Sequence, residues 1–135
     1  MNRQPILQTN RLIIRPLAQA DYEPLYQIAS DPAVWEQHPI HDRWRREVFD
    51  AFFADGMASG GALAVSDRTT GSLLGSTRFG PFDPEEGGVV EIGWTFFSTR
   101  HWGKGINPEM KRAMLAHAFA SVELVEFRVG DTNYR

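Results

Sequence analysis

The 135-residue sequence contains no cysteine, which excludes a disulfide framework, a thiolate metal site and a cysteine nucleophile. It also fits a reducing compartment. No apolar run approaches the roughly 20 residues that a membrane-spanning helix needs. The first residues, MNRQPILQTNRL, lack the apolar stretch of a secretory signal. These absences favour a cytoplasmic protein that has no membrane partner.

An excess of charge of one sign is also lacking, since 14 Lys and Arg residues nearly balance 17 Asp and Glu residues and the formal net charge is -3. A chain this close to neutral has no general electrostatic reason to bind nucleic acid, and none is expected as a partner. Hydrophobic residues make up 42% and charged residues 23%, which is typical of a globular protein. The length suits a single domain over residues 1–135.

Hydrophobic periodicity predicts an α/β (α+β) fold of order β-α-α-β-β-β-α-β, with helices packed on a mostly antiparallel sheet. The predicted strands cover 11–17, 62–65, 72–79, 89–97 and 124–129, and the predicted helices cover 21–30, 42–53 and 108–120. Pro16 indicates an edge strand or a strand exit, because proline lacks the N–H of a central ladder. Only DTNYR follows the last strand, which leaves a bare sheet edge. We therefore expect a domain that is incomplete at its C-terminus or completed by a partner, such as a second copy in a homodimer.

A glycine-containing loop between a strand and an amphipathic helix is the most informative segment. Gly103 and Gly105 allow a tight turn that brings backbone N–H groups close to a ligand. Those groups and the helix dipole favour phosphate, and Arg100 and Lys104 add positive charge. A pyrophosphate is the expected ligand, although an isolated Gly-x-Gly is more often only a turn.

The helix after this loop has its own start signal and apolar face. Asn107 is predicted to be its N-cap and Pro108 its first residue. The apolar stripe consists of Met110, Ala113, Met114, His117 and Ala118. Pro108 also occupies the third glycine position of GxGxxG, and GxxxxGK[ST] is absent. A nucleotide-binding protein that uses the same loop is therefore disfavoured.

Arg100-x-x-Gly103-x-Gly105 matches the [QR]xxGx[GA] signature of GNAT acetyltransferases, at the start of a helix. The segments EIGWTFFSTRHWGKGINPEMKRAMLAHAF, TNRLIIRPLAQADYEPLYQIASDPAVW and FRVGDTNYR resemble the branch that includes ribosomal-protein N-terminal acetyltransferases. The resemblance covers nearly the whole chain in the correct order. It implies direct transfer of an acetyl group from acetyl-CoA, without a metal, to a primary amine of a protein N-terminus or a small molecule.

The resemblance also implies the cofactor-binding residues. The loop and the helix start would hold the coenzyme A pyrophosphate, while the strand end before them would pair with the pantetheine arm and supply backbone N–H groups to the oxyanion. These positions are Trp94, Thr95, Phe96, Phe97, Arg100, His101, Trp102, Gly103, Lys104, Gly105 and Ile106, and Asn133, after the last strand, would also contact coenzyme A. The family's general acid lies on a helix that would come after Arg135, and Tyr134 is a poor substitute, so no acid is assigned.

Glu91 is the predicted general base, because a neutral amine must form before it attacks the thioester. On a regular strand it shares a face with Val89, Gly93 and Thr95, whereas Val90, Ile92, Trp94 and Phe96 share the other. The matching Glu in related enzymes is often assigned as base. The alternative is that Glu91 pairs with a basic residue or orients the substrate.

The region between the two early helices is predicted to border the acceptor. Trp35, His38 and Trp44 are expected to bind substrate, with core packing as the alternative for both tryptophans. His38 and His41 lack further ligands, so no metal is expected. Arg43, Arg45 and Arg46 are expected to form a solvated helix face, with attraction of an acidic acceptor as the alternative. For the whole chain, the alternative function is a non-catalytic acyl-CoA-binding or partner-binding module on a degenerate GNAT fold.

Overall fold

The computed structural model describes residues 1–127 and contains one six-stranded sheet with helices on both faces. The strands are β1 (Leu7–Gln8), β2 (Leu12–Pro16), β3 (Ala62–Asp67), β4 (Leu73–Asp83), β5 (Val89–Phe97) and β6 (Leu124–Phe127), and the α-helices are α1 (Tyr22–Ala29), α2 (Arg46–Ser59) and α3 (Ile106–Phe119). The strand order is β1-β2-β3-β4-β5-β6, and each neighbouring pair is antiparallel except β5 and β6, which are parallel. The predicted α/β arrangement is confirmed, with the short β1 as an addition.

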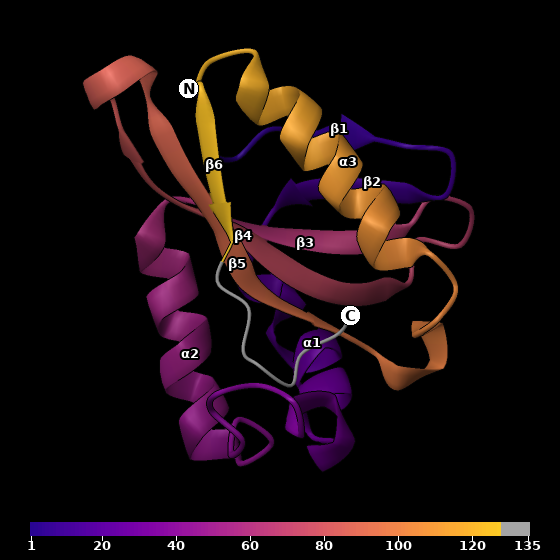
Figure 1. The fold of residues 1–135 in the computed structure, drawn as a ribbon. Helices are drawn as coiled ribbons and strands as arrows, with labels where there is room; N and C mark the ends of the chain where they lie inside the picture. The colour runs from indigo at the N-terminus through magenta and orange to yellow at the C-terminus, as the bar shows by residue number, and fades with distance from the viewer. Residues whose placement is uncertain (128–135) are drawn as a thin grey trace.

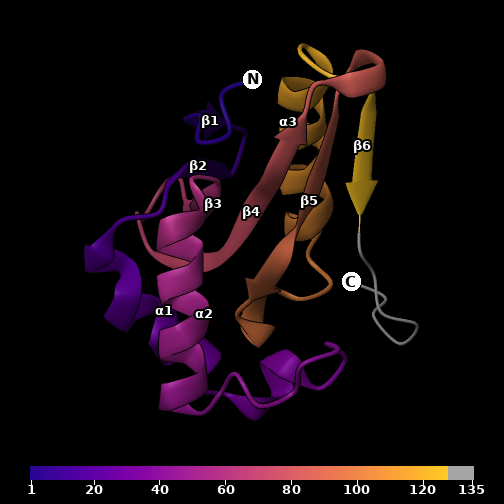
Figure 2. The ribbon, with the colours of Figure 1, turned by 90° about the vertical axis from the view of Figure 1, so that its left-hand side faces the viewer.

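The two faces of the sheet carry separate hydrophobic cores. α3 covers one face, whereas α1 and α2 cover the other (Figure 1, Figure 2). Met110 and Met114 of α3 pack with Ile92 of β5 in the first core. Phe49 of α2 packs with Phe96 of β5 in the second. Burial of these side chains is the main source of stability. Within residues 1–127, no helix combines the length and the apolar character that crossing a membrane requires.

α2 covers a later stretch of chain than the predicted 42–53, because it begins at Arg46. Arg45 before it is extended, and its N–H donates to the carbonyl of Asp42 at 3.0 Å in a turn. The helix ends at Gly60, whose φ of 74° provides a left-handed C-cap. The prediction that Trp44 belongs to this helix is therefore wrong.

α3 begins at Ile106, two residues before the predicted start. Gly105 precedes it with a φ of 77°, and no side chain caps the helix, so the prediction of Asn107 as N-cap is wrong. Pro108 is tolerated as the third helical residue, because N–H groups of the first turn need no partner within the helix. In the predicted apolar stripe, Met110, Met114 and Ala118 are buried, while Ala113 and His117 are half-buried.

β5 has the predicted bounds but is not a regular strand. Trp94 has a φ of 54°, and the register with β4 shifts between the pairs Arg78–Gly93 and Ser76–Phe96. β5 therefore contains one extra residue, a bulge that changes which face each later side chain meets. Trp94 lies over Arg78, and Phe96 packs in the core under α1 and α2, whereas Ile92 packs under α3. The prediction that Trp94 and Phe96 share a face with Ile92 is wrong for this reason.

The remaining strands differ from prediction mainly at their ends. Pro16 is the last residue of β2, opposite Leu63, which agrees with a strand exit. β4 runs past Phe79 to Asp83. β6 is described to Phe127, and its predicted end at 129 lies outside the described residues.

Candidate active site

A cleft with a volume of about 650 Å³ lies between β5, the loop after it, the start of α3 and the segment 34–43. The predicted site residues that line it are His38, Glu91, Trp94, Thr95, Phe96, Phe97, His101, Trp102, Gly103, Gly105 and Ile106. The structure thus brings the predicted base, the strand end and most of the loop to one place. Four predicted residues of the described chain lie outside the lining, namely Trp35, Trp44, Arg100 and Lys104.

The loop before α3 exposes its backbone to the cleft. Gly103 and Gly105 have φ values of 76° and 77°, a conformation that side chains other than glycine rarely adopt. A Cβ on Gly103 would meet no atom within 4 Å, so open space adjoins this position. α3 starts next to the loop, and its first N–H groups have no partner within the helix. Backbone donors and the positive end of the helix dipole therefore meet at one end of the cleft.

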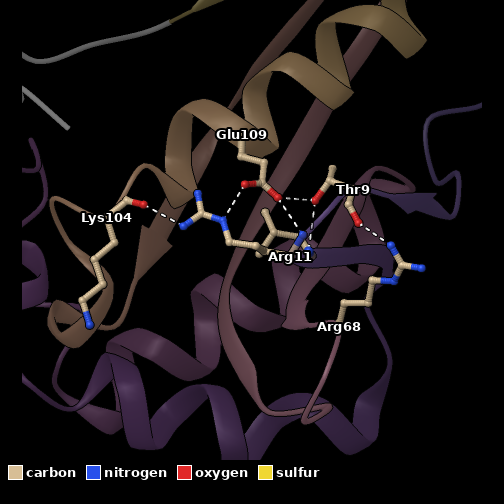
Figure 3. A network of polar contacts seen from close by, with 6 residues as sticks. Thr9, Arg11, Arg68, Lys104 and Glu109 are labelled. Carbon is tan, nitrogen blue, oxygen red and sulfur yellow. Dashed lines mark hydrogen bonds and ion pairs between the residues drawn. The ribbon is translucent and has the colours of Figure 1, made fainter.

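A polar network holds this loop from behind (Figure 3). Glu109 of α3 accepts hydrogen bonds from the Thr9 hydroxyl at 2.5 Å, the Arg11 backbone N–H at 2.9 Å and Arg11 Nε at 2.7 Å. Arg11 Nη1 donates to the carbonyl of Lys104 at 2.8 Å. Burial alone would raise the pKa of Glu109, but the bonds from Thr9 and Arg11 and the charge of Arg11 outweigh it, and the pKa is lowered. The chain before β2 thereby fixes the loop between β5 and α3.

Positive charge surrounds the same loop. Arg100 and Lys104 are exposed, and His101 lines the cleft. Burial and the charge of Lys104 lower the pKa of His101, with a smaller effect from Arg100, whereas Asp67 opposes the shift. This environment favours the neutral imidazole, and a bound anion would make its protonation easier.

The bulged end of β5 forms the middle of the cleft. Gly93 and Phe96 pair with β4, but Trp94 and Thr95 between them have no partner in the register. Thr95 Oγ1 lies 2.9 Å from Thr77 Oγ1, which holds its side chain toward β4. Glu91 lines the cleft from the same strand and is half-buried. The backbone of this strand end can therefore face a ligand beside a carboxylate.

The predicted acceptor residues lie in three different environments. Trp35 is 1% exposed and its Nε1 donates to the carbonyl of Ala29 at 2.8 Å, so it is a core residue. His38 lines the cleft, with its ring 5.1 Å from that of Trp35. Trp44 is 40% exposed and lies outside the lining. Of the three, the structure brings only His38 to the cleft.

Sequence reasoning missed several lining residues, among them Asn107 and Lys111, and it favoured a solvated helix face for Arg43, which also lines the cleft. Asn107 Oδ1 is buried without a hydrogen-bond partner among the described residues. Burial lowers the pKa of Lys111, whose Nζ lies 5.3 Å from the ring centre of Phe127. Helical spacing could have placed Asn107 and Lys111 together, because positions four apart share one face of a helix. The orientation of Arg43 had no comparable signal.

Two further predictions concern ligands. Asn133 lies outside the described residues, as does Tyr134. Within residues 1–127, no group of three or more His, Cys, Asp or Glu side chains could hold a metal ion.

Comparison with known proteins identifies the family of this chain. The family model described as "Acetyltransferase (GNAT) domain" matches residues 11–133. YkkB of Bacillus subtilis (strain 168) is 32% identical over 123 residues, which cover 88% of this chain and 71% of that protein. The N-acetyltransferase p20 of Bacillus licheniformis is 29% identical over 136 residues, covering 94% of this chain and 74% of p20. The chain thus spans about seven tenths of the length of these two relatives.

Solved structures agree on the architecture. A probable GNAT-family acetyltransferase of Chromobacterium violaceum ATCC 12472 superposes with a TM-score of 0.81 at 20% identity, covering 96% of this chain and 68% of that one. An acetyltransferase of Agrobacterium tumefaciens str. C58 gives a TM-score of 0.67 at 27% identity, covering 96% and 77%. The first likeness concerns the fold alone.

Proposed function

This chain belongs to the GNAT acetyltransferase family, and from that premise we propose that it transfers the acetyl group of acetyl-CoA directly to a primary amine. The proposal depends chiefly on one observation: a single cleft connects the glycine loop at the start of α3 with the bulged end of β5 and Glu91. An anion-binding end and a carboxylate in the same cleft are what thioester binding and amine activation require.

The loop residues are the proposed holders of the coenzyme A pyrophosphate. Open space adjoins Gly103, whereas a Cβ on Gly105 would lie 3.3 Å from Arg11 Nη2. Backbone N–H groups of this loop would donate to phosphate oxygens. His101, Trp102 and Ile106 line the same end. Arg100 and Lys104 are exposed and would contribute charge from outside the cleft. The proposal also retains Asn133, as a contact to coenzyme A.

The strand end is the proposed place of the thioester. Backbone from Trp94 to Phe97 would pair with the pantetheine arm, and N–H groups at the bulge would stabilise the oxyanion of the tetrahedral intermediate. Glu91 would accept the proton of the acceptor ammonium, directly or through a water. The neutral amine then attacks the carbonyl carbon, a C–N bond forms, the C–S bond breaks, and the thiolate leaves and takes up a proton. No residue of this chain is assigned as the donor of that proton.

A protein N-terminus is the proposed acceptor, following the resemblance to the ribosomal-protein acetyltransferase branch. His38 lines the cleft next to the buried ring of Trp35 and would contact this acceptor. A small-molecule amine would use the same end of the cleft. If the protein acetylated such an amine and not a peptide N-terminus, the small molecule would become the favoured acceptor.

The alternative is an acyl-CoA-binding module that does not catalyse acetyl transfer. It predicts the same coenzyme affinity but no release of coenzyme A thiol when amines are added. The two functions therefore separate on turnover rather than on binding.

The decisive experiment compares two glycines of matched geometry. Gly103 and Gly71 have φ values of 76° and 77°, and a Cβ on either would meet nothing within 4 Å. Gly103→Trp should fill the coenzyme end and abolish calorimetric binding of acetyl-CoA and acetyl transfer. Gly71→Trp, in the turn between β3 and β4, carries the same backbone strain and should retain both. Failure of the folded parent to bind acetyl-CoA, or equal loss in both variants, would contradict the proposal.

A further inference from the structure

Three arginines near the start of α2 have different environments. Arg45 pairs with Glu47 at 3.0 Å and Arg46 pairs with Glu23 at 2.8 Å, in each case with both side chains exposed. Arg43 is half-buried and lines the active-site cleft. The solvated surface expected for this stretch therefore describes Arg45 and Arg46 but not Arg43.

Aromatic rings hold the Arg43 guanidinium in the cleft. Its central carbon lies 4.3 Å from the ring centre of Phe52 and 5.6 Å from that of Trp35. Such contacts orient the planar group and favour its charged form. Arg43 forms no ion pair with a carboxylate of residues 1–127.

A second arginine nearby, Arg78, already pairs with a carboxylate, although its buried Nε has no hydrogen-bond partner among the described residues, whereas Arg43 lines the cleft without such a pair. Arg78 is 4% exposed, and its Nη1 pairs with Asp55 at 2.8 Å while the ring of Trp94 lies 4.6 Å from its guanidinium carbon. Burial and the charge of Arg78 lower the pKa of Arg43, against the opposing charges of Asp42 and Asp55. Even so, a guanidinium keeps its charge at neutral pH. A charge that is partly removed from water is stabilised by an opposite charge.

We propose that Arg43 recognises a carboxylate of the acceptor, close to the amine that is acetylated. This inference rests on the proposed function and names the acceptor class for the same cleft. Glu91 lines the cleft from β5 and Arg43 lines it from the segment before α2, so an acceptor with an ammonium and a carboxylate would meet opposite charges at both groups. The guanidinium fork matches two carboxylate oxygens, which gives this contact its specificity.

Matched acceptors test the inference and distinguish two sources of the carboxylate. A peptide that begins with Asp is compared with one that begins with Asn, and a free amino acid is compared with its amide. The parent should prefer the carboxylate member of at least one pair by about tenfold or more in kcat/KM. Arg43→Gln should reduce this preference to less than about twofold, mainly through KM, and Arg43→Lys should retain part of it. Arg45→Gln removes a charge two residues away on the surface and should leave the preference unchanged.

Binding of the same acceptors, followed by NMR in the presence of coenzyme A, gives a readout that needs no turnover. Carboxylate-dependent binding that Arg43→Gln removes would support the inference even if no acetyl transfer occurred. Transfer to both members of each pair at rates within twofold would overturn the inference and leave the acetyltransferase function intact. If Arg43→Gln fails to fold by circular dichroism, the acceptor pairs on the parent and on Arg43→Lys decide.

Discussion

The two ends of the cleft are built in different ways. The coenzyme end consists largely of backbone, with Gly103 and Gly105 at positive φ, the first turn of α3 and the bulge of β5. The acceptor end consists largely of side chains, among them His38 and Arg43, which rest on aromatic rings. Backbone groups are fixed by the fold, whereas side chains can be exchanged one at a time. The coenzyme end is therefore expected to be sensitive to conformation and the acceptor end to residue identity.

The bulge at Trp94 offers the test with the largest expected effect. Two substitutions there remove the same ring but favour different backbone conformations. Glycine adopts the observed φ of 54° readily, whereas valine disfavours it. We expect Trp94→Gly to retain transfer. The kcat of Trp94→Val should be about 100-fold lower than that of Trp94→Gly, because an oxyanion donor would be displaced. The measurement is kcat at saturating acetyl-CoA. Equal kcat values in the two variants would mean that this backbone conformation plays no part in transfer.

The polar network behind the loop allows a test of the coenzyme end by a substitution outside the cleft. Glu109→Ala leaves the Thr9 hydroxyl, the Arg11 backbone N–H and Arg11 Nε without the carboxylate that accepts from them. We expect the free energy of unfolding to fall by about 1–3 kcal/mol, at the lower end because Arg11 is 44% exposed. Acetyl-CoA affinity should fall by about tenfold, since Arg11 would no longer fix the carbonyl of Lys104. Thermal unfolding and calorimetry measure the two effects.

Two variants sharpen the test of the network. Glu109→Gln retains one side-chain acceptor and should lie between the parent and Glu109→Ala. Glu23→Ala removes a fully exposed ion pair with Arg46 on the other face of the sheet and should leave coenzyme affinity unchanged. The lowered pKa of Glu109 also fixes the sign of the pH effect. Its stabilising contribution is present above its unfolded-state pKa and is lost as the pH falls through the folded-state value.

The same contrast explains how much the sequence could predict. Arg100, Gly103 and Gly105 identify the loop, because backbone conformation leaves a glycine pattern that a single sequence displays. The order of the elements could be predicted from hydrophobic periodicity, which a single sequence also displays. The bounds of β5 were predicted as well, but period-two alternation cannot detect an extra residue at Trp94. That residue becomes visible only through the pairing of β5 with β4.

The acceptor end was less predictable, because its geometry depends on where a helix begins. The apolar spacing around Trp44 predicted a helix from residue 42, which would have placed Arg43 within its first turn. α2 begins at Arg46 instead, and the turn before it carries Arg43 over Phe52. Asn107 shows the same weakness at the coenzyme end, since Asn-Pro resembles a helix start. The left-handed Gly105 sets the true start two residues earlier.

The smallest expected effect concerns His101 and the pH dependence of coenzyme binding. In the free protein, burial and neighbouring cations lower its pKa, whereas a bound pyrophosphate would raise it. Because the bound-state pKa is the higher one, binding takes up protons. Affinity for acetyl-CoA should therefore be constant above the bound-state pKa, rise as the pH falls through it, and level off below the free-state pKa.

The expected change in affinity is several-fold, and calorimetry in buffers of different ionisation enthalpy measures the proton uptake directly. His101→Gln should remove both the uptake and the pH dependence that it causes. His41→Gln, an exposed histidine in the segment before α2, should retain both. Proton uptake that persists in His101→Gln would assign the titration to another group and would separate His101 from the phosphate end of the cleft. Uptake that only His101→Gln removes would place negative charge of the coenzyme next to this side chain, as the backbone-built end of the cleft requires.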